Sequence, residues 1–285
     1  MQSKLISANK TLKVRGKIID LRIPKVMGIL NVTPDSFFDG GLYSRESELL
    51  KQTEKMLLEG ADFIDIGGYS SRPKSEDITI DEEWKRVLPA IQSIKKEFPS
   101  ALLSIDTFRS QIARQSISEG CDMINDISAG QLDNNMFNTV SDLQVPYVIM
   151  HMRGTPQTMT QFAHYDNLVN EIIDYFHKIL YQLNQQGIKD VLVDPGFGFA
   201  KTVDQNFELL NRLEHLHVLD QPLLIGLSRK SMIWKTLDTT PEFALSGTTS
   251  LNTVALLKGS SILRVHDVKE AKETIRLLDK MKHAT

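Results

Sequence analysis

Eight short apolar runs, each followed by a longer segment with helical periodicity, constrain the fold of this chain more than any other feature. The runs are apolar at almost every position, which is typical of strands buried on both faces of a parallel sheet. They are Val26–Leu30, Asp62–Ile66, Leu102–Ile105, Met123–Ile124, Tyr147–Met150, Val191–Val193, Leu223–Ile225 and Ile262–Val265. The pattern therefore predicts an α/β chain in which parallel strands alternate with helices.

Two architectures fit such an alternation, an open doubly wound sheet and a closed (β/α)₈ barrel, also called a TIM barrel. Eight units favour the barrel, and the stretch from Val26 to Lys282 gives about 32 residues per unit, as in typical barrels of roughly 250 residues. An open sheet usually carries Gly-x-Gly-x-x-Gly after its first strand, whereas Asn31-Val-Thr-Pro-Asp35 stands here. The sequence predicts a single barrel domain over residues 26–285.

Residues 1–25 precede the first of these units. Two weak strands, Thr11–Val14 and Lys17–Leu21, flank Gly16 in this segment. They predict a short N-terminal β-hairpin extension, and one place for it is over the N-terminal mouth of the barrel.

Composition excludes several classes of protein. Hydrophobic residues make up 41% of the 285, which is enough for a packed core and argues against global disorder. The net charge of −3 shows no basic excess, so we expect no nucleic-acid partner. An apolar run of about 18 residues and a signal-peptide core are both lacking, so we expect no membrane partner. Cys121 is the single cysteine and cannot form an internal disulfide, which favours a cytoplasmic location.

Polar side chains follow the predicted strands, at the end where barrel enzymes place their active sites. Asp106 and Asp194 come directly after buried strands, where a carboxylate is costly unless a donor-rich partner binds it. An ionised carboxylate can accept two hydrogen bonds from adjacent N–H donors, such as those of a 2-amino-pyrimidinone edge. Asn125 can donate and accept at the same edge. The alternative for each aspartate is an N-cap for the helix that follows.

Four basic residues from distant segments would meet at the same mouth of a barrel. These are Arg72, Lys230, Arg264 and His266. Convergent cations indicate an anionic ligand, and phosphate is the usual one near the last two strands of a barrel. The alternative is that each is a solvated surface charge.

Two loops have the composition of lids over a bound substrate. Residues 31–41 combine a turn proline with Phe37, Phe38 and terminal glycines, and residues 67–74 follow the second strand. Exposed aromatic rings in a loop could close over an aromatic substrate and exclude water. The alternative is that the loop packs onto its own barrel.

Six motifs together resemble the dihydropteroate synthase family, which joins 4-aminobenzoate to a pterin diphosphate in folate biosynthesis. The resemblance covers the chain from about Val26 onward, with the motifs in the family's order. They are Asn31-Val-Thr-Pro-Asp-Ser-Phe37, Asp106-Thr-Phe108, Asn125-Asp-Ile-Ser-Ala-Gly130, Asp194-Pro-Gly-Phe-Gly-Phe199, Ser228-Arg-Lys230 and Arg264-Val-His-Asp267.

The resemblance implies a barrel fold, Mg²⁺ dependence, a homodimer and a role for each matching residue. The pterin ring would be held by Asp106, Asn125, Asp194 and Lys230. The diphosphate would be held by Asn31, Arg72, Arg264 and His266, with Asn31 also a metal ligand. The 4-aminobenzoate would contact Phe37, Ser71, Phe199 and Ser231. The catalytic set would be Asp35, Phe37, Ser71, Arg72 and Lys230.

The implied chemistry is substitution at the carbon that carries the diphosphate, and it needs no protein nucleophile. This chain departs from the common family pattern Gly-Gly-Glu-Ser-Thr-Arg-Pro-Gly in its second loop. Tyr69 stands in place of Glu, Ser71 in place of Thr and Lys74 in place of the last Gly. Further along, Ala200 stands where Gly is usual before Lys201.

Three other interpretations compete with a synthase. A methyltetrahydrofolate-dependent methyltransferase barrel would share the pterin-binding residues but would not need Arg72, Arg264 and His266 for a diphosphate. A non-catalytic pterin-binding paralogue would be expected to lose the loop residues. A sugar-phosphate aldolase-type barrel would need a Schiff-base lysine inside a strand, whereas Lys230 lies beyond its strand.

Overall fold

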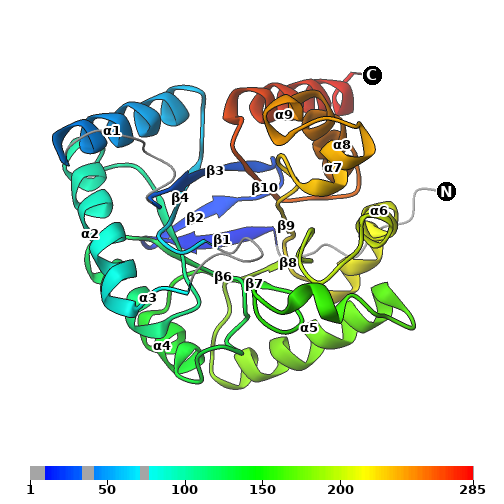
Figure 1. The fold of residues 1–285 in the computed structure, drawn as a ribbon, viewed down its shortest axis with the longest axis horizontal. Helices are drawn as coiled ribbons and strands as arrows, with labels where there is room; N and C mark the ends of the chain where they lie inside the picture. Colours follow the sequence, from blue (N-terminus) through cyan, green and yellow to red (C-terminus); the bar gives the residue numbers. More distant parts are fainter. Residues whose placement is uncertain (1–9, 34–41, 71–76, 285) are drawn as a thin grey trace.

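A ring of eight parallel strands surrounded by helices forms the body of the molecule (Figure 1). The computed structural model describes residues 10–33, 42–70 and 77–284. The strands follow one another around the ring in the order β8-β7-β6-β5-β4-β3-β10-β9. A parallel bridge between Val193 and Leu223, with the Val193 amide donating to the Pro222 carbonyl at 2.9 Å, joins the two ends of this order. The predicted fold class, a (β/α)₈ barrel, is confirmed.

Each of the eight apolar runs coincides with a barrel strand to within two residues, because strands buried on both faces leave this signature in the sequence. The strands are β3 (Lys25–Asn31), β4 (Phe63–Gly67), β5 (Leu103–Asp106), β6 (Met123–Asp126), β7 (Tyr147–Met150), β8 (Val191–Asp194), β9 (Leu224–Ile225) and β10 (Ile262–Val265).

The helices of the described part of the chain lie outside the ring of strands (Figure 1). The α-helices are α1 (Leu42–Leu58), α2 (Ile80–Glu97), α3 (Ser110–Ser118), α4 (Met136–Leu143), α5 (Leu168–Gln185), α6 (Val203–Asn211), α7 (Ser231–Thr236), α8 (Leu245–Leu257) and α9 (Val268–Lys282). The 3₁₀ helices are η2 (Met159–Phe162), η3 (Leu213–Leu219) and η4 (Pro241–Phe243). None of the described helices is long and apolar enough to cross a membrane.

The start of α6 shows how local sequence fixes a helix end. The Gln205 amide donates to Thr202 Oγ1 at 3.2 Å, and the Thr202 amide donates to Gln205 Oε1 at 2.9 Å. This reciprocal capping box satisfies two amide groups that the first helical turn leaves unpaired. It sets the point at which the loop after β8 ends.

The N-terminal hairpin closes one mouth of the barrel. Strands β1 (Thr11–Val14) and β2 (Lys17–Asp20) pair antiparallel, and Leu12, Val14 and Leu21 are buried. These side chains share one apolar cluster with residues from the first halves of the barrel strands, namely Met27, Phe63, Met123, Val148, Leu192, Leu224 and Ile262. The predicted hairpin and its place over the N-terminal mouth are confirmed.

An ion pair ties the hairpin turn to the barrel. Arg15, in the turn between β1 and β2, donates through Nε and Nη2 to the buried carboxylate of Asp122. Asp122 also accepts from the Leu103 amide at 2.8 Å and from Lys95 Nζ at 3.2 Å. With this mouth covered, polar chemistry is left to the opposite mouth, where the strands end.

Candidate active site

An apolar layer lies where β5 to β8 end, above the packed interior of the barrel. Its buried members are Ile127, Met150, Met152, Met159 and Ala200, and Phe108 and Phe199 pack against them. Met150 ends β7 and the other members come from the segments that follow the strands, so the layer forms an apolar wall beside the polar groups of the mouth. Such a wall suits a flat aromatic ligand.

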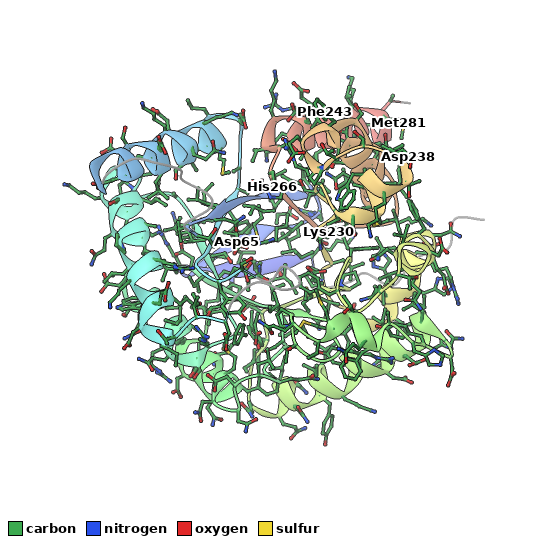
Figure 2. All side chains as sticks on the ribbon, in the orientation of Figure 1. Asp65, Lys230, Asp238, Phe243, His266 and Met281 are labelled. Carbon is green, nitrogen blue, oxygen red and sulfur yellow. The ribbon has the colours of Figure 1, made fainter. Side chains whose placement is uncertain are left out.

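Arg264 on β10 links two carboxylates across the mouth. Its Nε donates to Asp65 Oδ2 on β4 at 2.6 Å, and its Nη2 donates to Asp106 Oδ2 on β5 at 2.6 Å. Asn125 on β6 donates through Nδ2 to the same Asp65 oxygen at 2.9 Å. Figure 2 labels Asp65, which lies on β4 within the ring of strands. Four strands therefore contribute to one polar network.

Burial shifts the pKa values of ionisable groups in this network. It raises the pKa of Asp106 to about 7, although Arg264 opposes the shift. Burial by itself would lower the pKa of Arg264, but Asp65 and Asp106 outweigh it and raise that pKa, so the guanidinium stays charged. Asp65 Oδ1 has no hydrogen-bond partner within the described ranges, and Asp65 is fully buried. An unpartnered buried carboxylate oxygen is costly, so Asp65 Oδ1 is an acceptor that the described residues leave unsatisfied.

Asp194 and Lys230 form the other half of the mouth, around the bare backbone of Gly226. A Cβ at Gly226 would lie 4.0 Å from Asp194 Oδ2, 3.8 Å from Lys230 Nζ and 4.0 Å from Arg264 Cβ. Burial raises the pKa of Asp194, opposed by Lys230, and lowers the pKa of Lys230 to about 8, opposed by Asp194. The absence of a side chain at Gly226 keeps space between these charges.

The turn after β8 holds Asp194 and Lys230 in place. The Gly196 amide donates to Asp194 Oδ1 at 2.8 Å, so one carboxylate oxygen is fixed by the backbone. Lys230 Nζ donates to the Phe197 carbonyl and lies 5.0 Å from the centre of the Phe199 ring. Ser231 follows Lys230 as the first residue of α7 and is half-buried.

Lys201 braces this turn from inside the protein. Its Nζ donates to the Gly196 carbonyl at 3.0 Å and the Phe199 carbonyl at 3.1 Å, and it lies 3.0 Å from His151 Nδ1. Burial lowers the pKa of Lys201 to about 7, although Asp194 opposes the shift. Ala200 beside it adopts φ +48°, the left-handed region that explains why glycine is usual there.

Two further predicted residues, Asn31 and His266, lie at the ends of the neighbouring strands β3 and β10. Asn31 ends β3, and a Cβ at Gly67 would lie 3.3 Å from Asn31 Oδ1 and 3.8 Å from Asp106 Oδ2. Gly67 therefore leaves room between this amide oxygen and the carboxylate. His266 follows β10, and its Nδ1 lies 3.0 Å from Ser228 Oγ.

The mouth thus brings together most of the residues singled out from the sequence. Asn31, Asp106, Asn125, Asp194, Lys230, Arg264 and Phe199 surround one opening, with His266 and Ser231 on the same side of the barrel. The predicted loop residues Asp35, Phe37, Ser71 and Arg72 lie outside the described residues.

Two residues of the site were missed from the sequence. Asp65 carried a signal, because it is a charged residue in the middle of a run expected to be buried on both faces. Lys201 carried none, since a lysine after a strand is ordinarily a surface residue. Arg264 was assigned to an anion, and the structure shows its guanidinium paired with Asp65 and Asp106.

The turn after β8 generates a stability prediction. A Cβ at Gly196 would lie 2.1 Å from the His151 carbonyl oxygen, and its φ is +72°. Gly187 has φ +74° with nothing within 4 Å of such a Cβ, so it is a matched control. We expect Gly187→Ala to lower the free energy of unfolding by about 1 kcal/mol, and Gly196→Ala by at least about 3 kcal/mol.

Urea denaturation of the two variants measures the difference. Equal losses would show that the contact with His151 does not constrain the turn.

Known proteins share the sequence pattern and the fold of this chain. Residues 27–266 match the family described as "Pterin binding enzyme". Over 267 residues the chain is 39% identical to the dihydropteroate synthase of Escherichia coli K12, covering 93% of this chain and 94% of that protein. It is 40% identical over 257 residues to the enzyme of Synechocystis sp., covering 89% of each.

Solved structures show the same relationship. Xanthomonas albilineans dihydropteroate synthase with 4-aminobenzoic acid superposes with a TM-score of 0.90 at 35% identity, covering 97% of this chain and 99% of that one. The Yersinia pestis enzyme with a sulfonamide drug superposes with a TM-score of 0.89 at 37% identity, covering 96% and 100%. The predicted resemblance is confirmed, and the chain belongs to the dihydropteroate synthase family of pterin-binding enzymes.

Proposed function

We propose that this chain is a transferase that condenses 6-hydroxymethyl-7,8-dihydropterin diphosphate with 4-aminobenzoate, giving 7,8-dihydropteroate and diphosphate. The observation that carries the proposal is the polar network of Asp65, Asp106, Asn125 and Arg264 facing Asp194 and Lys230. Related proteins support it, because a Xanthomonas albilineans dihydropteroate synthase has been solved with 4-aminobenzoic acid and with 7,8-dihydropteroate.

The network favours a ligand rich in N–H donors. Asn125 donates its Nδ2 to Asp65, which as a carboxylate can only accept, so the amide presents Oδ1 as its acceptor. Asp106 and Asp194 add two carboxylates to the same mouth. A pterin offers a 2-amino group and ring N–H donors that such acceptors bind well. Lys230 adds a donor for the ligand's carbonyl or ring nitrogen.

The leaving diphosphate would lie toward Asn31, Arg264 and His266, with Arg72 as a further proposed contact. Asn31 fits Mg²⁺, because an amide oxygen is a hard ligand and Gly67 leaves room beside it. Within the described residues, no cluster of three or more His, Cys, Asp or Glu side chains could form an all-protein metal cage. Bound Mg²⁺ would supply positive charge that stabilises the departing diphosphate.

The reaction breaks the bond from the pterin methylene carbon to the diphosphate oxygen and forms a bond from that carbon to the arylamine nitrogen, which loses a proton. No described residue needs to act as nucleophile. The chain's contribution is to orient the pterin and to hold charge at the leaving group. Phe199 and Ser231 border the proposed 4-aminobenzoate position. Phe37 and Ser71 are further proposed contacts and lie outside the described residues.

We also propose a cytoplasmic homodimer, as the family resemblance implies. The buried free thiol of Cys121 fits a reducing compartment. Exposed apolar side chains gather on one part of the barrel wall, including Phe243 on η4 and Leu277 and Met281 on α9, with Phe243 and Met281 labelled in Figure 2. A second copy of the chain that covers them would remove this surface from water. The mass in solution tests this assembly.

The direct test of the proposed function is diphosphate release by the purified protein with the pterin diphosphate, 4-aminobenzoate and magnesium. We expect release that depends on both substrates.

Asp194→Asn should raise the KM for the pterin diphosphate by more than about tenfold, since it removes a charge-assisted hydrogen bond. Asp142→Asn, which changes an exposed carboxylate paired with Arg114, is the matched control and should leave KM unchanged. Release that does not require 4-aminobenzoate would rule out the synthase.

The raised pKa of Asp106 generates a pH prediction. In the free protein this carboxyl titrates near 7, and donors on the pterin bind its ionised form better, so binding is coupled to loss of a proton. We expect pterin affinity to fall as pH drops below about 7, by up to about tenfold per unit, and to level off above it. Asp106→Asn does not titrate and should flatten this slope.

Calorimetry between about pH 5.5 and 8 measures both proteins. An equally steep slope in Asp106→Asn would assign the titration to another group.

A further inference from the structure

Segments that follow β4, β5 and β7 meet at four side chains, which we call the Tyr69 cluster. Its members are Tyr69, Phe108, Arg109 and Gln157. Tyr69 stands two residues after β4, at the position where the family pattern has a glutamate. Gln157 Nε2 donates to Tyr69 Oη at 2.7 Å, which ties the segment after β4 to the segment after β7.

The rings of the cluster meet in a favourable geometry. The centres of the Tyr69 and Phe108 rings are 5.0 Å apart with an interplanar angle of 86°, an edge-to-face contact. Arg109 Cζ lies 5.4 Å from the Tyr69 ring centre and 5.2 Å from that of Phe108. A guanidinium at this distance is attracted to both aromatic rings.

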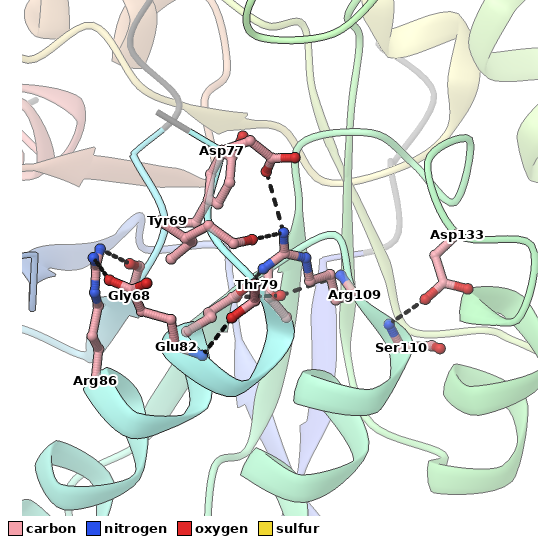
Figure 3. A network of polar contacts seen from close by, with 12 residues as sticks. Gly68, Tyr69, Asp77, Thr79, Glu82, Arg86, Arg109, Ser110 and Asp133 are labelled. Carbon is pink, nitrogen blue, oxygen red and sulfur yellow. Dashed lines mark hydrogen bonds and ion pairs between the residues drawn. The ribbon is translucent and has the colours of Figure 1, made fainter. Parts of the chain in front are cut away.

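Arg109 is itself held firmly by α2 and the residues just before it (Figure 3). Its Nη1 donates to Glu83 Oε2 at 2.7 Å, and its Nη2 donates to the Ile78 carbonyl and to Asp77 Oδ1 at 3.3 Å. Glu83 is fully buried, and its Oε1 accepts from Thr107 Oγ1 at 2.7 Å. The Arg109 guanidinium is therefore held in one position, and the Tyr69 ring packs against it.

The backbone before Tyr69 is fixed as well. Arg86 Nη1 on α2 donates to the Gly68 carbonyl at 3.2 Å, and Figure 3 shows this contact beside the cluster. The position of the Tyr69 ring is thus determined from its own backbone, from Arg109 and from Gln157.

The cluster reaches the pterin side of the mouth through two residues. Thr107 and Phe108 directly follow Asp106, the carboxylate that pairs with Arg264. Phe108 also packs against the apolar layer that includes Met152 and Met159 and borders Phe199. Tyr69 is therefore linked through Phe108 both to the apolar layer and to the strand end that carries Asp106.

We propose that Tyr69 is a positioning residue for the pterin substrate. Its ring fixes Phe108 and Arg109, and through them the segment that carries Asp106. This inference rests on the proposed function, because it assigns the pterin to the mouth of the barrel. A glutamate at position 69 could pair with Arg109 but could not pack edge-to-face on Phe108, so the contact with Phe108 depends on an aromatic side chain at this position.

Binding of 6-hydroxymethylpterin, measured by calorimetry without turnover, tests the inference. We expect Tyr69→Ala to weaken binding about five- to tenfold, because it removes the ring from both Phe108 and Arg109. Tyr69→Phe keeps the ring and should bind within about twofold of the parent. Tyr181→Ala, which removes an exposed tyrosine from α5, is the matched control and should not change binding.

Tyr69→Leu gives a second test if Tyr69→Ala does not fold, since it keeps bulk without an aromatic ring, and it should bind as weakly as predicted for Tyr69→Ala. Parent-like affinity in every folded variant that lacks the ring would overturn the inference, as would a loss in Tyr69→Phe as large as in those variants. Failure of the parent protein to bind the pterin at all would instead overturn the proposed function.

Discussion

The ion pairs of Arg264 are the interaction on which the mouth of the barrel depends. Strand β3 lies between β10 and β4 in the sheet, and β5 lies beyond β4. Arg264 therefore reaches across β3 to Asp65 and to Asp106. A buried charge is costly unless it is paired and hydrogen-bonded, so these contacts fix the relative positions of strands β10, β4 and β5 and orient the Asn125 amide through Asp65.

Burial disfavours the charged forms of the ionisable groups in both halves of the mouth, and a ligand can offset this cost. The pKa values of Asp106 and Asp194 are raised and that of Lys230 is lowered, so all three groups are displaced toward their neutral forms. A ligand with N–H donors for the carboxylates and an acceptor for the ammonium restores hydrogen bonds to the charged forms. The site thus selects a ligand by its pattern of hydrogen-bond donors and acceptors, and Gly226 and Gly67 leave space for that ligand.

The fold could be predicted from the sequence because its strands are buried on both faces, which leaves continuous apolar runs at regular spacing. The hairpin over the N-terminal mouth was also predicted, from two weak strands around Gly16. Convergence of Asp106, Asn125, Asp194 and Lys230 followed from the rule that barrel strands end at one mouth. The contacts between individual side chains could not be predicted from the sequence, because hydrophobic periodicity indicates which residues are buried and not which residues they contact. The contacts of Arg264 across β3, the brace at Lys201 and the packing of Tyr69 on Phe108 all belong to this class.

Asp65 orients the Asn125 amide, and a double-mutant cycle on pterin affinity tests this role. Asp65→Ala, which removes the acceptor of the Asn125 amide, and Asn125→Ala would be measured by calorimetry singly and together. Because Asp65 holds the Asn125 amide, we predict strong non-additivity, with a coupling free energy of about 1 kcal/mol or more. Effects that simply add would contradict this role of Asp65, since they would show that Asp65 and Asn125 contribute to pterin binding independently.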